Sequence, residues 1–253
     1  MKFNRIGKII ICVLLSCCLT AVLGCSQVSE VQAAGRVNLA KAAVSPKWIG
    51  NLKAARNAKQ VFVVAGVGQT TAYISMHEKD SDGKWKEIMT TPGFIGRSGL
   101  DKQREGDGKT PTGVFRFNRA FGIAKDPGCR IKYKKVTGAD YWSGDSRPGH
   151  GYNTLVSIKD IPDLNTGNSE RIIDYVTEYQ YCLNLGYNAD CVAGKGAALF
   201  LHSFGSSKPY TAGCVAIPQD QMLKVMQNVR PDCVVIIDHL AKLSPETKRA
   251  WGY

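Results

Sequence analysis

The sequence predicts a mainly β fold with few helices, and three observations support this. Short apolar runs rich in β-branched residues recur along the chain. Glycine-rich stretches without periodicity separate them, and a helical repeat of apolar residues is found only near the C-terminus. Apolar runs of roughly four to eight residues between turn signals are typical of strands, whereas a helix needs a longer stretch with a period of 3.6 residues.

The predicted strands differ in how deeply they are buried. Residues 60–65 form a continuous β-branched run before a glycine, which indicates a buried strand, whereas residues 84–89 roughly alternate polar and apolar side chains, which indicates a half-buried one. Between them, the sequence DSDG at residues 80–83 supplies turn chemistry. Further strands are expected at residues 70–77, 114–117, 152–158, 179–185, 197–201 and 233–237.

One helix is expected after Pro218, which suits the first helical turn. The apolar residues that follow recur at helical spacing and are expected to pack in the core: Met222, Val225, Met226 and Val229. Residues 92–112 are expected to form a long loop, because their glycines permit tight turns. This loop lacks the G-x4-G-K-[ST] spacing of a phosphate-binding loop.

The N-terminus has the pattern of an export signal. A basic start at residues 1–8 precedes an apolar run at residues 9–24, and residues 31–33 have the small-residue pattern of ordinary cleavage. An alternative is a lipobox at residues 22–25, which would lipidate Cys25, although Leu23 is bulky for such a box. A retained membrane anchor is a third interpretation.

The expected organisation is a signal peptide at residues 1–33, a linker or short helix at 34–57, one catalytic domain at 58–240 and a C-terminal tail at 241–253. Cleavage after residue 33 removes three basic residues and one acidic residue, which leaves 30 basic and 20 acidic residues, a net charge of +10. This charge favours anionic surroundings. Since no nucleic-acid-binding motif is found, the cell envelope is the expected partner.

The cysteines allow several interpretations. Cys12, Cys17 and Cys18 lie in the signal, and ordinary cleavage leaves five cysteines, an odd number that leaves at least one thiol unpaired. Cys182 and Cys191 flank eight residues and are a candidate disulfide, although all five thiols can also be reduced. No metal site is expected, because there is no C-x2-C pair and the four histidines are scattered.

The chemistry-bearing residues gather near residues 202–214. A cysteine nucleophile needs a base for its proton and backbone N–H donors for the developing oxyanion. His202 follows an apolar run, Gly213 permits close backbone approach beside Cys214, and the Thr211 hydroxyl can orient the base or the substrate. Taken singly, a histidine or a buried cysteine is more often structural.

His202 followed by TAGCV at residues 211–215 resembles the catalytic motif of the L,D-transpeptidases, the YkuD-type domain. The stretch GDGKTPTGVF at residues 106–115 is similar to a segment found upstream in this family, and the resemblance covers roughly residues 58–238. It implies a mainly β sandwich or barrel, with Cys214 as nucleophile and His202 as base. Gly213 and Cys214 would supply oxyanion donors, and Thr211 would support the site.

The resemblance also implies an activity in peptidoglycan biosynthesis, cell wall organisation and cell shape. Cys214 would attack the carbonyl of a stem-peptide diamino acid, release D-alanine and form a thioester. A second stem's amine would then give a 3–3 cross-link, whereas water would give an L,D-carboxypeptidase. Donor and acceptor stem peptides are thus the implied partners, and no cofactor is needed.

The sequence departs from the family pattern at three points. The chain has Ala212 where the family often has histidine, Ala216 where it often has arginine or asparagine, and a shorter interval between His202 and Cys214. The missing charge at residue 216 affects substrate recognition, and the candidates to replace it are Arg97, Arg104 and Arg147.

Three other classes of protein share some of these features. A sortase would have a threonine before its cysteine and a downstream arginine, whereas here Gly213 precedes Cys214. Cysteine peptidases of the wall-hydrolase type place the cysteine before the histidine, and only His239 follows Cys214. The alternative from outside the enzymes is a non-catalytic wall-binding protein of the same fold, which Ala212 and Ala216 would suit.

Overall fold

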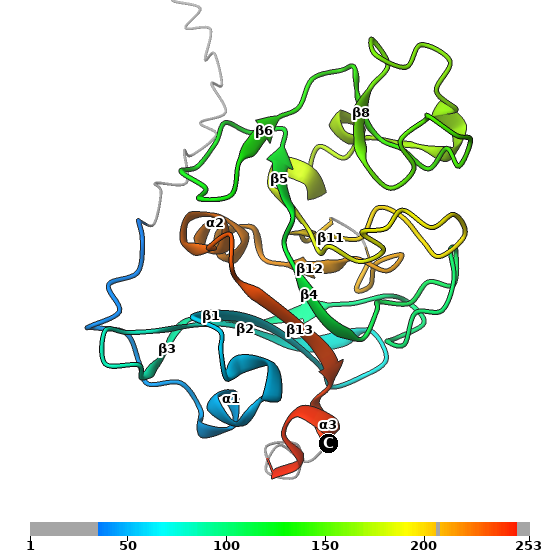
Figure 1. The fold of residues 1–253 in the computed structure, drawn as a ribbon. Coiled ribbons are helices and arrows are strands. Elements are labelled where there is room, and N and C mark those ends of the chain that lie inside the picture. The colour runs from blue at the N-terminus through cyan, green and yellow to red at the C-terminus, as the bar shows by residue number, and fades with distance from the viewer. Residues whose placement is uncertain (1–34, 206–207, 247–253) are drawn as a thin grey trace, which may run out of the picture. The chain divides into compact units, whose positions relative to one another are not determined.

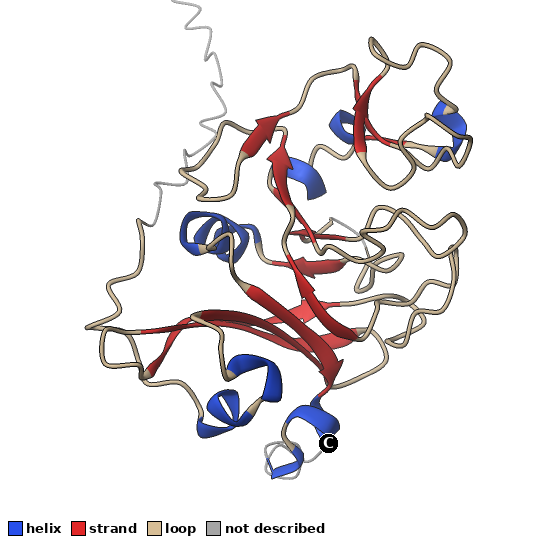
Figure 2. Cartoon of the chain, viewed as in Figure 1, coloured by secondary structure: helices blue, strands red, loops and turns tan. Residues whose placement is uncertain are grey.

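A computed structural model describes residues 35–205 and 208–246. The expected signal peptide, the candidate lipidation site at Cys25 and the end of the expected tail lie outside these residues. In the described part of the chain, strands and loops predominate and helices are short (Figure 2). The prediction of a mainly β fold with few helices is confirmed. No helix among the described residues is both long and apolar enough to cross a membrane.

Most strands of the described chain belong to one ten-stranded sheet, in the order β4-β13-β1-β2-β3-β12-β11-β10-β5-β6 (Figure 1). Their bounds are β1 Gln60–Gly66, β2 Thr71–Lys79, β3 Trp85–Phe94, β4 Gly113–Arg116, β5 Arg119–Gly122, β6 Tyr133–Lys135, β10 Cys182–Asn184, β11 Phe200–Ser203, β12 Val215–Ile217 and β13 Val234–His239. A second sheet has the order β8-β7-β9, with β7 Asp140–Trp142, β8 Leu155–Ser157 and β9 Glu170–Arg171.

The helices are α1 Lys47–Asn51, α2 Gln219–Asn228 and α3 Leu240–Leu243, and four 3-10 turns are η1 Lys53–Ala55, η2 Thr166–Asn168, η3 Ile172–Asp174 and η4 Glu178–Gln180. Strand β1 is buried on both faces, because its side chains alternate between two cores. Phe62 and Val64 pack in the core that contains α2, whereas Val61 and Val63 pack in the core that contains α1. Figure 1 shows these two helices on opposite sides of β1 and β13.

Within the expected linker at residues 34–57, the described residues 35–57 pack against the domain and are not a free linker. It contains α1, so the short-helix alternative is observed, and Ile49 and Ala55 are fully buried against β1 and β13. Ser45 is also tied to the sheet, because its hydroxyl forms a 2.9 Å hydrogen bond with Nδ1 of the buried His77. A linker would not bury apolar side chains in this way.

The strands β10, β11 and β12 separate two cores. Leu201 and Val215 face the large core, together with residues of β1, β2 and α2. The opposite face carries Phe200 and Cys214, which cluster with Trp142 of the small sheet. The small sheet therefore lies over the face of the large sheet that carries the candidate nucleophile.

Several strand boundaries differ from those predicted. Strand β3 extends to Phe94, into the expected loop at residues 92–112, because it stays paired with β2 along its whole length. The expected strand at residues 152–158 is reduced to β8, and the one at 179–185 begins as the turn η4 before it becomes β10.

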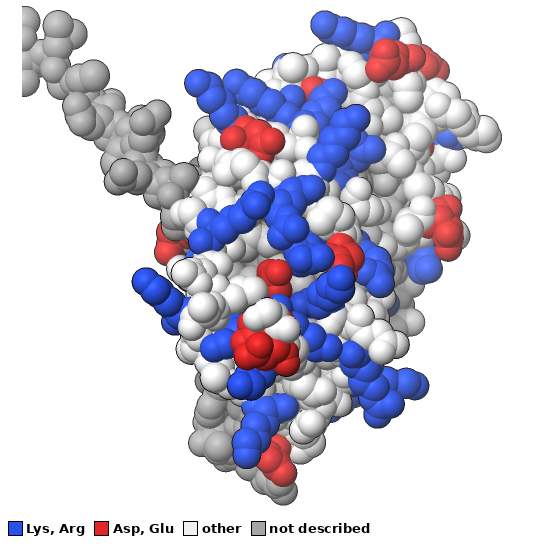
Figure 3. Space-filling model, turned by 60° about the vertical axis from the view of Figure 1, so that its left-hand side comes forward, with Lys and Arg blue, Asp and Glu red and all other residues white. Residues whose placement is uncertain are grey.

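Figure 3 shows one face of the molecule, over which Lys and Arg side chains are widely spread.

Candidate active site

The parallel pairing of β11 and β12 brings the two candidate catalytic residues to one face of the sheet. Leu201 is paired with Val215, and His202 is paired with Ala216. Cys214 directly precedes Val215 and therefore lies beside Phe200. Because side chains alternate along a strand, His202, Cys214 and Ala216 point to the same side.

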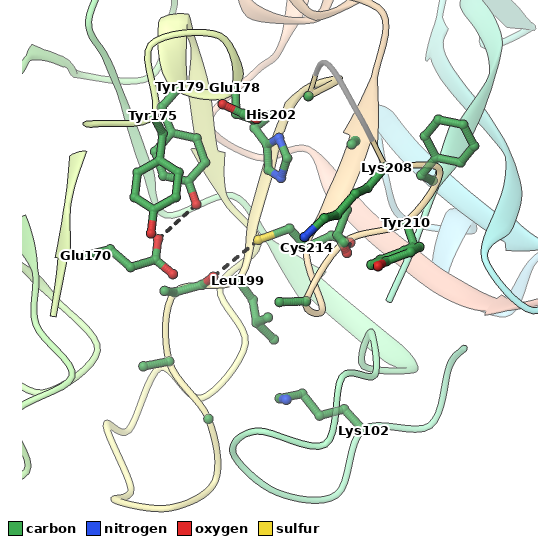
Figure 4. A pocket seen from close by; sticks show the side chains of 18 of the residues that line it. Lys102, Glu170, Tyr175, Glu178, Tyr179, Leu199, His202, Lys208, Tyr210 and Cys214 are labelled. Carbon is green, nitrogen blue, oxygen red and sulfur yellow. Dashed lines mark hydrogen bonds between the residues drawn. The ribbon is translucent and has the colours of Figure 1, made fainter. Parts of the chain in front are cut away.

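That side opens into a cavity of about 480 Å³, which both His202 and Cys214 line (Figure 4). Thr211, Ala212 and Ala216 line it as well. The larger side chains around it come from separate parts of the chain: Phe94, Lys102, Glu105, Glu170, Tyr175, Glu178, Tyr179, Lys208 and Tyr210. The candidate nucleophile therefore lies at a site that a substrate can enter.

The Cys214 sulfur is held by two backbone groups. The thiol donates to the Ala198 carbonyl at 3.3 Å and accepts the Phe200 N–H at 3.4 Å. Burial, and after it the charge of Glu170, raise the pKa of the Cys214 thiol to about 12, although the Phe200 N–H and Lys102 act in the opposite direction. At neutral pH the resting residue is therefore a thiol and not a thiolate.

The His202 imidazole is fixed in one orientation. Its Nδ1 lies 2.7 Å from the Ser203 carbonyl oxygen, so Nδ1 carries the proton and Nε2 keeps the lone pair of the neutral ring. The Tyr179 ring packs edge-on against it, with centroids 5.4 Å apart. Burial lowers the pKa of His202, against smaller opposing effects of the Ser203 carbonyl and Glu178. The neutral ring can thus accept a proton at Nε2.

Thr211 braces the turn before the cysteine. Its hydroxyl donates to the Cys214 carbonyl at 2.7 Å and accepts the Gly213 N–H at 3.0 Å. The Gly213 N–H is therefore already bonded, which corrects its expected role as a free oxyanion donor. Gly213 has φ +145°, and a Cβ there would lie 2.8 Å from the Lys109 carbonyl oxygen, so only glycine fits this position without strain.

The upstream stretch at residues 106–115 is hydrogen-bonded to the turn that precedes Cys214. The buried Thr110 hydroxyl donates to the Gly213 carbonyl at 2.8 Å and accepts the Gly96 N–H at 2.9 Å. The loop is itself organised by Asp107, whose carboxylate accepts hydrogen bonds from Lys102 Nζ and three backbone N–H groups. Partial burial opposes ionisation of Asp107, but these donors hold its pKa well below the usual range.

The expected disulfide is not formed. All five cysteines in the described residues are free thiols. Cys182 is buried in β10, where the register places it opposite His202. Cys191 is half-buried in the loop that follows β10, and its thiol approaches the Ala189 carbonyl. Among the described residues, no group of three or more His, Cys, Asp or Glu is arranged to hold a metal ion.

The cations of the cavity are not those that the sequence suggested. Arg97, Arg104 and Arg147 do not line it, and Arg147 is instead paired with two aspartates. The lysines in the walls are Lys102 and Lys208. No local motif marked either lysine, because both come from loops whose path only the fold reveals.

Two acidic groups of the cavity were also not predicted. Glu170 belongs to β9 and Glu178 to η4, next to Tyr179, and all three line the walls around Cys214 (Figure 4). Their sequence context resembles an ordinary polar loop. The small sheet and the turn after it bring them to the nucleophile.

Comparison with known families agrees with this geometry. The family model of the L,D-transpeptidase catalytic domain, YkuD, matches residues 59–237. The chain belongs to this family. The expected L,D-transpeptidase resemblance is thereby confirmed.

The chain was also compared with solved structures and with curated proteins. Among solved structures, the chain is similar to the helical cell shape determining protein Pgp2 from Campylobacter jejuni, with 16% identity and a TM-score of 0.39. The match covers 72% of this chain and 48% of that one, so the L,D-transpeptidase-family chain described here spans about half the length of that protein. A search of curated proteins found no significant match.

Proposed function

We propose that this protein is an exported cysteine acyltransferase that forms 3–3 cross-links between peptidoglycan stem peptides through a Cys214 thioester. The observation that carries the proposal is that Cys214 and a neutral His202, its Nδ1 tied to a carbonyl, line one cavity on the same face of β11 and β12. This is the pair of groups that nucleophilic catalysis at a carbonyl needs.

In the first half-reaction, the thiol proton moves from Cys214 to His202 Nε2 as the sulfur attacks the carbonyl carbon of the diamino acid. The Cys214 N–H is the proposed donor to the oxyanion, because the Gly213 N–H is bonded to Thr211. His202 then gives the proton to the amine of the terminal D-alanine. The C–N bond breaks, and the stem remains on Cys214 as a thioester.

His202 acts here as a general base during the attack and not as half of a preformed ion pair. Burial raises the pKa of Cys214 to about 12 and lowers that of His202. Both groups are therefore neutral before substrate binds. Proton transfer has to accompany bond formation, which general-base catalysis allows.

In the second half-reaction, the side-chain amine of another stem attacks the thioester, the C–S bond breaks and the thiol is restored. If water attacks in place of the amine, the same acyl-enzyme makes the protein an L,D-carboxypeptidase. The acyl-enzyme is common to both outcomes, so it is the intermediate to be sought first.

The carboxylate of the donor's terminal residue needs a positive charge near Cys214. Lys102 is already engaged with Asp107 at 2.9 Å, whereas Figure 4 shows Lys208 extended toward the sulfur. We therefore assign this contact to Lys208, in place of the side chain that Ala216 lacks. Export rests on the pattern of residues 1–33, and the positive net charge suits an anionic cell envelope.

The proposal is tested by intact mass spectrometry of the protein without residues 1–33 after incubation with a carbapenem, a class that acylates members of this family. One adduct is expected on the protein, and it should be lost in Cys214→Ala but kept in Cys191→Ala. A folded, reduced protein without an adduct would contradict the proposal and favour a non-catalytic wall-binding role. Muropeptide analysis then distinguishes 3–3 cross-linking from trimming.

A further inference from the structure

Glu170 is directed into the active-site cavity by its place on an edge strand. It is the first residue of β9, where it is paired with Trp142 of β7. Its neighbour Arg171 points the other way and bonds the Gly138 carbonyl at 3.1 Å and Asp174 at 3.3 Å. Because side chains alternate along a strand, this fixes the Glu170 carboxylate on the side of the cavity.

The carboxylate has a polar partner there but no cation. Tyr179 donates its hydroxyl to Glu170 Oε2 at 2.8 Å, and within residues 35–205 and 208–246 no lysine, arginine or histidine forms an ion pair with it. Lys102, on another wall of the cavity, is bonded to Asp107. A carboxylate held in a poorly solvated site is favourable only when an opposite charge joins it.

The negative charge of Glu170 disfavours ionisation of the Cys214 thiol. Glu170 is the acidic residue whose charge raises the pKa of the Cys214 thiol, whereas Glu178 acts on His202. A carboxylate that makes thiolate formation harder does not help acylation. The second half-reaction has a different requirement, because an amine that arrives as an ammonium ion has to lose a proton beside the thioester.

We propose that Glu170, held by Tyr179, binds the ammonium group of the acceptor stem and removes one of its protons, so that the amine can attack the Cys214 thioester. This assignment rests on the proposed acyl transfer and adds to it a catalytic residue for the second step. The ligand class is a primary ammonium on a flexible side chain, as in a diamino acid.

Each proton of the acceptor ammonium has a defined destination in the second half-reaction. The acceptor ammonium gives its first proton to the Glu170 carboxylate, and the neutral nitrogen attacks the thioester carbon. The C–N bond forms and the C–S bond breaks. The second nitrogen proton passes through His202 to the leaving sulfur, which restores the Cys214 thiol. Glu170 returns its proton to solvent when the cross-linked product leaves.

Burial makes Glu170 a suitable base for this step. It raises the pKa of Glu170 to about 7, opposed by the Tyr179 hydrogen bond, and the same burial lowers the pKa of an ammonium group that enters. The two values therefore approach one another. The other titratable groups that interact with Glu170 are Tyr175, Cys182 and Cys214, and all are neutral near pH 7.

The experiment separates the two half-reactions. The donor probe is a synthetic stem tetrapeptide that ends in D-alanine and has its side-chain amine acetylated, so that it cannot act as an acceptor. The acceptor probe is a stem tripeptide with a free side-chain amine. Acyl-enzyme formed with the donor is isolated and chased with the acceptor or with buffer alone, and both products are quantified by mass spectrometry.

The variants are Glu170→Gln and a control, Glu87→Gln. Glu87 is a half-buried glutamate of β3 that does not line the active-site cavity. We expect Glu170→Gln to be acylated at least as fast as the wild type and to lose about 100-fold in aminolysis, a typical effect of removing a general base. Hydrolysis in buffer should change less than aminolysis. Glu87→Gln should behave as the wild type in all three measurements.

A second variant, Tyr179→Phe, tests the proton transfer to Glu170 independently of any change that Glu170→Gln makes in the shape of the site. Wild-type aminolysis should rise with pH through about 7 as Glu170 ionises. Tyr179→Phe keeps the ring but removes the hydrogen bond that lowers the pKa of Glu170, so this rise should move to higher pH.

The outcomes separate the two proposals. Normal aminolysis in Glu170→Gln, an equal loss of aminolysis and hydrolysis, or an unshifted pH profile in Tyr179→Phe would overturn the role of Glu170 and leave the acyl-enzyme intact. A wild-type protein that is not acylated by the donor would overturn both.

Discussion

The Cys214 thiol should react slowly with small alkylating agents, and its reactivity should rise steeply with pH. Its sulfur is buried, and the nearby Glu170 charge adds to the effect of burial, so that its pKa is about 12. The neutral His202 beside it has no positive charge with which to stabilise a thiolate before substrate binds. The free protein therefore differs from cysteine enzymes that keep a thiolate–imidazolium pair at rest.

The size of the effect follows from two opposing factors. At pH 7 a thiol with a pKa of about 12 is ionised to about 10⁻⁵, whereas an ordinary thiol with a pKa near 8.5 is ionised to about 3%, roughly 3,000-fold more. The more basic thiolate is intrinsically more nucleophilic, by about 40-fold for a Brønsted slope of about 0.45. Alkylation of Cys214 should therefore be about 100-fold slower than that of a free model thiol.

The assay is a time course of iodoacetamide labelling between pH 6 and 9, read by peptide mapping. Cys191 in the same sample is a half-buried internal reference, and Cys214→Ser identifies the peptide. Limited access can lower the absolute rate, but it does not change the slope, which should be about tenfold per pH unit. A rate that is independent of pH from 6 to 9, with a thiolate absorbance that disappears in Cys214→Ala, would refute the reasoning.

Three other substitutions follow from the same contacts. Gly213→Ala should lower the free energy of unfolding by about 1–3 kcal/mol in urea titrations, because φ is +145° and a Cβ would lie 2.8 Å from a backbone carbonyl oxygen; Gly83→Ala, where nothing lies within 4 Å, should cost less. Thr110→Val leaves the buried Gly96 N–H without its acceptor and should lower the free energy of unfolding by about 1–3 kcal/mol in the same assay. An unchanged urea midpoint would contradict the structural role of the Thr110 hydroxyl. His202→Ala should slow carbapenem acylation at pH 7 by about 10²–10⁴-fold, and normal acylation would exclude His202 as the base.

The strands that sequence reasoning found are those long enough to show a period. The runs at residues 60–65 and 233–237 became β1 and β13, a parallel pair of the large sheet. Strands such as β9, with two residues, and β12, with three, are too short for alternation to be visible. They form because neighbouring strands offer hydrogen-bonding edges, which is a property of the fold and not of the local sequence.

The candidate site was predictable where its chemistry is local and hidden where it is not. His202 and Cys214 were found because they flank one loop, and the structure places them on one face of the sheet. Glu170 and Tyr179 had no local signal, because the small sheet and the turn η4 after it bring them over that face. The same applies to Lys208, since a lone lysine in a loop carries no information about what it faces.

The two alanines that depart from the expected family pattern, Ala212 and Ala216, both line the active-site cavity. Ala216 lies directly beside His202 and opposite Phe94 of β3, so a long side chain there would enter the cavity next to the base. A cation at that point would further disfavour the imidazolium that has to form during acylation. In the proposed mechanism the positive charge comes instead from Lys208 on the loop, and the charge of Glu178 favours the imidazolium of His202. We therefore expect the departure at residue 216 to change which residue recognises the substrate carboxylate, without changing the proposed roles of Cys214 and His202.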